Sequence, residues 1–114
     1  MARRKLSPRA ERRVADRTAD KLTRDRERLA YLEPGGDSAR PIEVESASQI
    51  EPHALALTCL RCGGPNRLEE HAAVTLRARA PSGHDDRQRV ARLECPQCGA
   101  RREVWFRIAP ALPS

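Results

Sequence analysis

Aromatic side chains are scarce in this chain: its 114 residues include one Trp, one Tyr and one Phe. Hydrophobic residues make up 39% of the chain, and more of them follow Leu55 than precede it. Because so few large apolar side chains cannot offset the conformational entropy of the chain, a large hydrophobic core is excluded. The composition favours a small core that needs a second source of stability, such as a bound metal ion.

Long apolar runs are also missing. No stretch approaches the ~20 apolar residues of a membrane-spanning helix, so we expect no membrane partner. No apolar signal segment follows Arg3-Arg4-Lys5, and disulfide-forming compartments are reached through such segments. We therefore expect a soluble, cytoplasmic protein whose thiols stay reduced.

Patterns that carry catalysis are absent as well. The sequence offers no Ser-His-Asp arrangement, no paired carboxylates and no glycine-rich phosphate loop. We expect a protein that is not an enzyme and that has no small-molecule substrate.

The chain's only four cysteines form two Cys-x-x-Cys pairs, Cys59-Leu60-Arg61-Cys62-Gly63 and Cys95-Pro96-Gln97-Cys98-Gly99. Each pair is expected to make a tight turn that points two sulfurs at one spot, and four thiolates suit one tetrahedral ion. Gly63 and Gly99 follow each pair, where glycine allows a positive φ. Because four thiolates fill the coordination shell of zinc, we predict one structural zinc ion held by Cys59, Cys62, Cys95 and Cys98.

At these residues the sequence resembles the zinc ribbon family, whose knuckles commonly read Cys-Pro-x-Cys-Gly. The second pair fits this pattern fully, whereas the first carries Leu60 where proline often stands. The resemblance covers roughly the last half of the chain and implies short antiparallel strands clamped at one end by zinc. Zinc ribbons occur in transcription factors, polymerase subunits, ribosomal proteins, enzymes and interaction modules, so the fold alone does not fix a function.

Other uses of the four cysteines stay open at this point. Two disulfides would need an oxidising compartment. A redox Cys-x-x-Cys pair normally belongs to a longer α/β domain. Iron also accepts four thiolates. His53, His71 and His84 are not needed as ligands beside four thiols.

The order of the chain predicts a small α+β fold. Residues 1–33 form a basic tip and a charged helix, in which Ser7 is the N-cap, Pro8 stands first, and Pro34 follows the end. Residues 34–54 are an acidic linker rich in proline and glycine, with a short edge strand at Ile42 and Val44. Residues 55–109 are the antiparallel Cys₄ zinc ribbon, and 110–114 are a tail.

Within the ribbon, residues near 67–79 and 87–94 are predicted to pair as a hairpin around the turn-rich segment 81–86. After the second cysteine pair, Val104, Phe106 and Ile108 alternate with polar residues and share one face of a strand. Phe106 is the natural centre of the core, and Trp105 lies on the opposite face.

Charge is distributed unevenly around a net value of +6. Residues 1–13 hold six basic groups against one acidic group, residues 34–58 are net acidic, and residues 59–114 hold ten basic groups against six acidic ones. This balance permits binding to phosphates, and it equally permits the acidic middle to shield a basic surface. Only Lys5 and Lys21 are lysines, a skew typical of high-GC coding, so the number of arginines is a weak indicator of nucleic-acid binding.

A candidate nucleic-acid or partner surface comprises the hairpin arginines and the aromatic residue beside them: Arg77, Arg79, Arg87, Arg89, Trp105 and Arg107. Aligned arginines can follow a phosphate backbone, and an exposed indole can stack on bases. The alternatives are an ordinary surface of mixed charge and a Trp105 that covers the second sheet face under the helix or linker.

We therefore hypothesise a non-catalytic zinc-binding module that associates with nucleic acid or a nucleoprotein complex. The alternative is a protein–protein interaction adaptor that uses the ribbon sheet and the N-terminal helix. Ala15, Leu22 and Leu29 recur every seven residues, but this seam is less apolar than a coiled coil needs. The oligomeric state is left open.

Overall fold

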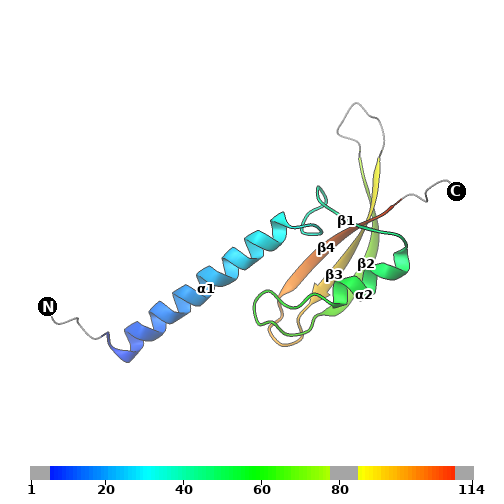
Figure 1. Cartoon of the computed structure of the whole chain (residues 1–114). Coiled ribbons are helices and arrows are strands. Elements are labelled where there is room, and N and C mark those ends of the chain that lie inside the picture. The colour runs from blue at the N-terminus through cyan, green and yellow to red at the C-terminus, as the bar shows by residue number, and fades with distance from the viewer. Residues whose placement is uncertain (1–5, 78–84, 110–114) are drawn as a thin grey trace.

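The computed structural model describes residues 6–77 and 85–109 and has a small α+β fold, as predicted (Figure 1). Its elements, in chain order, are α1 (Pro8–Leu32), β1 (Ile42–Val44), the short 3₁₀ helix η1 (Ala47–Gln49), α2 (Ile50–Leu55), β2 (Arg67–Leu76), β3 (Asp86–Glu94) and β4 (Arg101–Ile108).

Helix α1 begins and ends where the sequence signals place its caps. The side chain of Ser7 accepts a hydrogen bond from the Ala10 N–H at 3.2 Å, and Pro34 follows the last turn. At 25 residues the helix is ~38 Å long, and it extends away from the sheet in a molecule measuring 73 × 32 × 23 Å (Figure 1). Within α1, which is described throughout, only Ala30 is buried. Across the described ranges, none of the helices has the length and apolar character to cross a bilayer.

The four strands form one mixed sheet in the order β1-β4-β3-β2. The predicted hairpin is confirmed, since β2 pairs antiparallel with β3, and β3 pairs antiparallel with β4. The predicted edge strand is also present, but β1 runs parallel to β4, with Ile42 opposite Phe106. The sheet is therefore not purely antiparallel. A parallel pair needs a long crossover, and here the crossover contains α2, β2 and β3.

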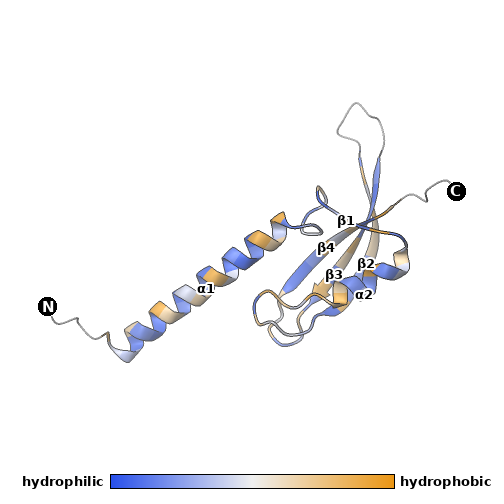
Figure 2. Ribbon diagram, in the orientation of Figure 1, coloured by the Kyte–Doolittle hydropathy of each residue, from blue (hydrophilic) through white to orange (hydrophobic). Residues whose placement is uncertain are grey.

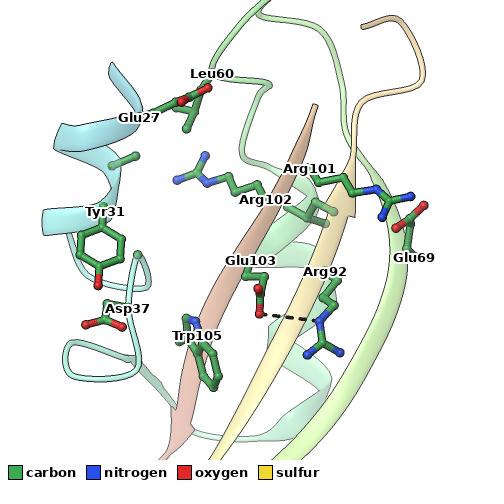
Figure 3. A pocket seen from close by; sticks show the side chains of 13 residues that line it. Glu27, Tyr31, Asp37, Leu60, Glu69, Arg92, Arg101, Arg102, Glu103 and Trp105 are labelled. Carbon is green, nitrogen blue, oxygen red and sulfur yellow. Dashed lines mark ion pairs between the residues drawn. The ribbon is translucent and has the colours of Figure 1, made fainter. Parts of the chain in front are cut away.

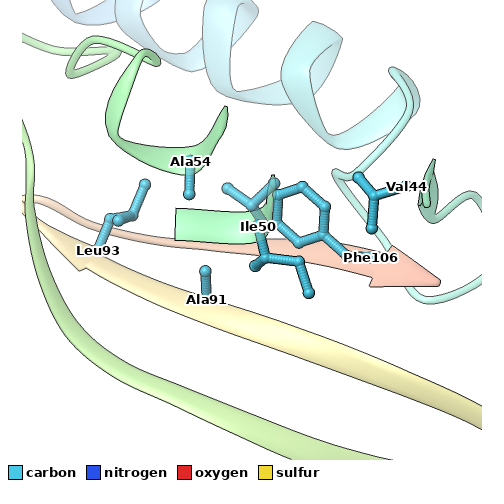
Figure 4. Close-up of a cluster of buried hydrophobic side chains, with 7 residues drawn as sticks. Val44, Ile50, Ala54, Ala91, Leu93 and Phe106 are labelled. Atoms are coloured by element: carbon cyan, nitrogen blue, oxygen red, sulfur yellow. The ribbon is translucent and has the colours of Figure 1, made fainter. Parts of the chain in front are cut away.

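One face of the sheet, the core face, is covered by α2, and Ala47 of η1 also packs against the core (Figure 4). Its cluster of buried side chains is Val44, Ile50, Ala54, Ala91, Leu93, Val104 and Phe106. Phe106 is fully buried, as predicted, and the ring of His53 meets it edge-on at 5.6 Å.

Residues 34–54 differ from the expected linker. They contribute β1, η1 and most of α2, and they place Val44, Ile50 and Ala54 in the core. The apolar residues of this segment are few and separated by acids and prolines, so each looks isolated in the sequence. Ile50 and Ala54 nevertheless stand four residues apart, which puts both on one side of a helix.

The second face of the sheet carries Val90, Arg92, Glu103 and Trp105, as the pairing register shows. The segment that follows α1 lies against it. At the edge of β4, the backbone N–H of Trp105 donates to the Gly35 carbonyl at 2.8 Å. From the second face itself, the side chain of Gln88 donates through Nε2 to the Ser38 carbonyl at 2.7 Å. These bonds fix the direction in which α1 leaves the sheet.

We predict that replacing Ile50 by Ala destabilises the fold far more than replacing Leu55 by Ala. Ile50 is 0% exposed and Leu55 is 44% exposed on the same short helix. Emptying the buried site should cost about 2–5 kcal/mol, whereas the exposed site should cost well under ~1 kcal/mol. Urea unfolding of the metal-loaded protein measures both. Equal, small losses would show that residues 50–55 do not belong to the core.

Candidate metal centre

Both cysteine pairs lie at the same end of the sheet. The first, in residues 59–64, connects α2 to β2, and the second, in residues 95–100, connects β3 to β4. Arg67 at the start of β2 pairs with Glu94 at the end of β3, and Glu94 also pairs with Arg101 at the start of β4. The antiparallel register therefore brings together two turns that lie 36 residues apart in the sequence.

The two turns have the same backbone geometry. In the first, the Gly63 N–H donates to the Cys59 carbonyl at 2.9 Å; in the second, the Gly99 N–H donates to the Cys95 carbonyl at 2.8 Å. Gly63 has φ +75° and Gly99 has φ +76°. These values lie in the left-handed region, which other residues adopt only with strain. The glycines predicted to close the knuckles do so.

The four cysteine sulfurs converge on one point and lie within 4.8 Å of one another. The Sγ atoms of Cys59 and Cys98 are 3.4 Å apart, as are those of Cys62 and Cys95. A tetrahedral ion with metal–sulfur bonds of ~2.3 Å sets its sulfurs ~3.8 Å apart, so the spacing fits one ion. All four cysteines are free thiols, two buried and two exposed. This arrangement forms a candidate metal site at the surface.

The first thiol of each knuckle favours the thiolate form. Burial raises the pKa of Cys59, but hydrogen bonds from the backbone N–H groups of Cys62 and Arg61 outweigh it and lower the pKa to about 6. The pKa of Cys95 is lowered mainly because the backbone N–H of Cys98 donates to its sulfur. Backbone dipoles thus prepare one negative ligand in each turn.

The second thiol of each knuckle favours the protonated form. The Gly64 N–H lowers the pKa of Cys62, but the facing sulfur of Cys95 and burial raise it to about 12. The pKa of Cys98 is raised in the same way. In each facing pair, Cys59 with Cys98 and Cys62 with Cys95, the pKa of one thiol is lowered and that of the other is raised. A cation that takes all four sulfurs as ligands must displace the protons that they still carry.

The surroundings of the site connect it to α1, and among the described residues they add no His, Asp or Glu to the four thiols. Arg61 Nε, within the first knuckle, donates to Glu27 Oε1 of α1 at 3.0 Å. His53 packs against Phe106, and His71 Nδ1 lies 3.6 Å from Glu51 Oε1 on the core side. His84 lies outside the described residues. In the part of the chain that is described, the clustered donors are the four cysteines.

The residues of the candidate nucleic-acid surface divide between the two faces of the sheet. Arg89 pairs with Phe106 and so lies on the core-face side, as does Arg87 two residues earlier. Trp105 and Arg107 lie on the second face. Arg77 follows the end of β2 and is exposed, while Arg79 lies outside the described residues. Among the described residues, the hairpin arginines Arg87 and Arg89 therefore lie on the opposite face from the indole of Trp105.

The charge of Arg107 is neutralised by an ion pair with Asp86. Its Nε donates to Asp86 Oδ1 at 2.9 Å, and its second nitrogen donates to Oδ2, so the pair is bidentate. These hydrogen bonds lower the pKa of Asp86 below its usual range. A guanidinium held in this way is a weaker phosphate ligand than a free one.

A cleft of about 680 Å³ separates the last turns of α1 from the second face of the sheet (Figure 3). Trp105 from β4 and Tyr31 from α1 line it, and the guanidinium of Arg102 reaches across it toward α1. Trp105 is half-buried there, as the alternative interpretation expected. Sequence reasoning did not single out Tyr31 or Arg102, because their roles depend on where α1 returns to the sheet.

No protein-family model, no curated protein and no solved structure matches this chain. The resemblance to zinc ribbons therefore rests on the two knuckles and their geometry.

We predict that Gly99→Ala weakens metal binding and Gly99→Asn does so less. An added Cβ at Gly99 would meet no atom within 4 Å, so only the positive φ opposes it. The backbone cost for alanine is about 1–2 kcal/mol, and asparagine tolerates this conformation better. Competition with a coloured chelator measures the metal affinity. If alanine and asparagine gave the wild-type affinity, the positive φ would not be needed to hold the site.

Proposed function

We propose that this chain is a non-catalytic zinc-binding module whose single ion is structural. The observation that carries the proposal is the convergence of four thiols within 4.8 Å of one another. Four protein sulfurs fill a tetrahedral shell and leave no position for water or substrate, which is typical of structural zinc. Zinc is favoured over iron because four thiolates supplied by two Cys-x-x-Cys turns are the usual ligand set and spacing of structural zinc sites.

The ion's role follows from what the two knuckles connect. They join the ends of β2, β3 and β4, and through Arg61 they contact α1. The core cluster beside them is small, and metal binding is the usual source of stability in domains of this size. Zinc should therefore contribute directly to the folding free energy.

We predict one zinc ion per chain and loss of the sheet on chelation. Protein purified without added metal is analysed by elemental mass spectrometry and circular dichroism, before and after a strong chelator. Cys59→Ser and Cys98→Ser should each lower zinc affinity at least tenfold, because each removes a thiolate. Gln97→Ala, in the second knuckle but outside the ligand set, should keep the ion. Bound iron with visible absorbance, or a metal-free sheet that survives, would contradict the structural-zinc proposal.

The module acts, we propose, as an adaptor that binds another protein through α1. The helix projects from the sheet, and four of its large apolar side chains, Val14, Leu22, Leu29 and Leu32, are each between 50% and 61% exposed. In proteins, a helix gains most of its stability by packing its apolar side against other residues. A helix of this length with an unpacked apolar side is therefore suited to a partner.

Association with nucleic acid is the second candidate, and the basic side of α1 favours it. Five exposed basic residues lie along that side at intervals of three or four: Arg13, Arg17, Lys21, Arg24 and Arg28. They form a longer row of cations than the hairpin arginines. Phosphate contacts of this kind act without sequence preference.

If nucleic acid is bound, we predict that affinity depends on α1 and falls with salt. Arg17→Glu with Arg24→Glu should reduce the slope of log affinity against log salt by about 2, since each phosphate contact contributes ~0.9. Arg77→Glu with Arg87→Glu changes the net charge equally on the hairpin and serves as the control. Fluorescence anisotropy with short duplex DNA and RNA measures both. Negligible affinity at low salt would remove this candidate.

A further inference from the structure

The large exposed aliphatic side chains of α1 lie on one side of the helix. Val14, Thr18, Leu22, Leu29 and Leu32, here called the apolar stripe, follow one another at helical spacing. Apolar bands recur along α1 in Figure 2. The Thr18 hydroxyl donates to the Val14 carbonyl at 2.9 Å, so its polar group is satisfied within the helix and its methyl group belongs to the stripe. The stripe runs along most of α1.

A different side of α1 contacts the rest of the protein. Glu27 accepts the hydrogen bond from Arg61, Ala30 is buried, and Tyr31 lines the cleft. The Tyr31 carbonyl also accepts from an Arg40 guanidinium nitrogen at 2.9 Å. These positions lie roughly opposite the stripe on the helix circumference. The C-terminal turns are thus anchored. The stripe stays open to solvent, and even Leu29, which borders a cavity of about 300 Å³ together with Leu57 and Leu60, is 61% exposed.

Both edges of the apolar stripe are basic. Lys21 and Arg28 lie along one edge, and Arg12 and Arg26 lie along the other; all four are exposed. Two carboxylates lie on this side of the helix: Asp25, half-buried between Leu22 and Leu29, and Glu11, exposed one turn before Val14. A complementary surface would therefore be apolar in the middle, acidic at both edges, and would carry a cation opposite Asp25.

We propose that the apolar stripe binds an amphipathic helix of another protein whose edges carry Glu or Asp. This inference rests on the proposed function, in which α1 receives a protein partner. A helix laid along the stripe buries the four large apolar side chains as anchors. Acidic edges pair with Lys21 and Arg28 on one side and with Arg12 and Arg26 on the other.

A second copy of this chain does not offer such a surface. In a parallel pair, Lys21 would face Arg26 of the copy across the seam, and Asp25 would face its own equivalent. In an antiparallel pair, each basic edge would meet the same basic edge of the copy. Like charges at these positions destabilise helix pairs, so the charge pattern opposes self-association.

An anionic membrane surface is also disfavoured. Glu11 and Asp25 both fall within the side that lipid would have to cover. The stripe holds no Trp or Phe, which membrane-surface helices use on their apolar side. A protein helix can supply a cation to Asp25, whereas acyl chains cannot.

The test uses the zinc-loaded full chain and three labelled synthetic helical peptides. One has a leucine seam with one lysine in it and glutamates at both edges, one has the same seam with lysine edges, and one has glutamate edges with a serine seam. Anisotropy titrations at low salt should show the glutamate-edged, leucine-seamed peptide binding at least tenfold more tightly than either of the others.

Substitutions on α1 test whether the apolar stripe and its basic edges cause the preference for the glutamate-edged peptide. Leu22→Ser with Leu29→Ser should weaken binding of that peptide at least tenfold. Lys21→Glu with Arg26→Glu should reverse the preference, so that the lysine-edged peptide binds more tightly. Arg9→Glu with Arg13→Glu makes the same change of net charge away from the edges and should keep the original preference. Circular dichroism confirms that each variant retains α1.

The outcomes separate this inference from the function on which it rests. If leucine-seamed peptides bind without regard to edge charge, the inference fails and a protein-binding α1 stands. If no peptide binds while duplex DNA does, both the inference and the adaptor function fail. Sedimentation showing a micromolar dimer that Leu22→Ser abolishes, or stripe-dependent binding to phosphatidylserine vesicles, would also overturn the acidic-helix partner.

Discussion

Four sulfur atoms must share one small volume at the end of the sheet, and the remaining structure is arranged around that requirement. Backbone N–H groups lower the pKa of Cys59 and Cys95, and the pKa of the facing thiols of Cys98 and Cys62 is raised. A cation that replaces the protons turns a crowded group of donors into a cross-link between two turns that are remote in sequence. The strands that leave those turns are then held in register at one end.

The core at the other side of the sheet supplements this cross-link. Phe106 is its largest member, and Ile50 and Ala54 of α2 cover it from above the sheet. Strand β1 pairs in parallel with β4 at one edge of the sheet. The segment after α1 is therefore hydrogen-bonded to the strand that comes last in the sequence. The Gly35 carbonyl, just after α1, accepts a hydrogen bond from β4, and Arg61 of the first knuckle donates to Glu27 of α1. The sheet therefore acts as a rigid base for a projecting helix.

Local signals in the sequence were sufficient to predict many of these features. The spacing of the cysteines and the glycines after them predicted the knuckles, Ser7 and Pro34 marked the ends of α1, and alternation around Phe106 located the core strand. Each of these depends on neighbours within a few residues. The position of Trp105 on the second face followed from the same alternation.

Features set by distant contacts could not be predicted in this way. Helix α2 is too short for a clear periodicity and contains Pro52, so its segment looked like a linker. Val90 and Ala91 are both buried, which hides the two faces of β3 and with them the direction of Arg87 and Arg89. A register shift between Leu68 and Glu70 further breaks the alternation of β2. The apolar residues of α1 could be recognised from their seven-residue spacing, but the sequence could not show that the sheet would leave them uncovered.

The strand order carries a consequence for biosynthesis. Strand β4 comes after every other strand in the chain, yet it lies between β1 and β3 in the sheet. While the chain is being made, β1 has no neighbour to pair with, Ile50 has no Phe106 to cover, and the first knuckle has no second knuckle opposite it. The ribosome must therefore release β4 before the sheet and the two knuckles can close, and until then only the local β2–β3 hairpin has its partner strand available.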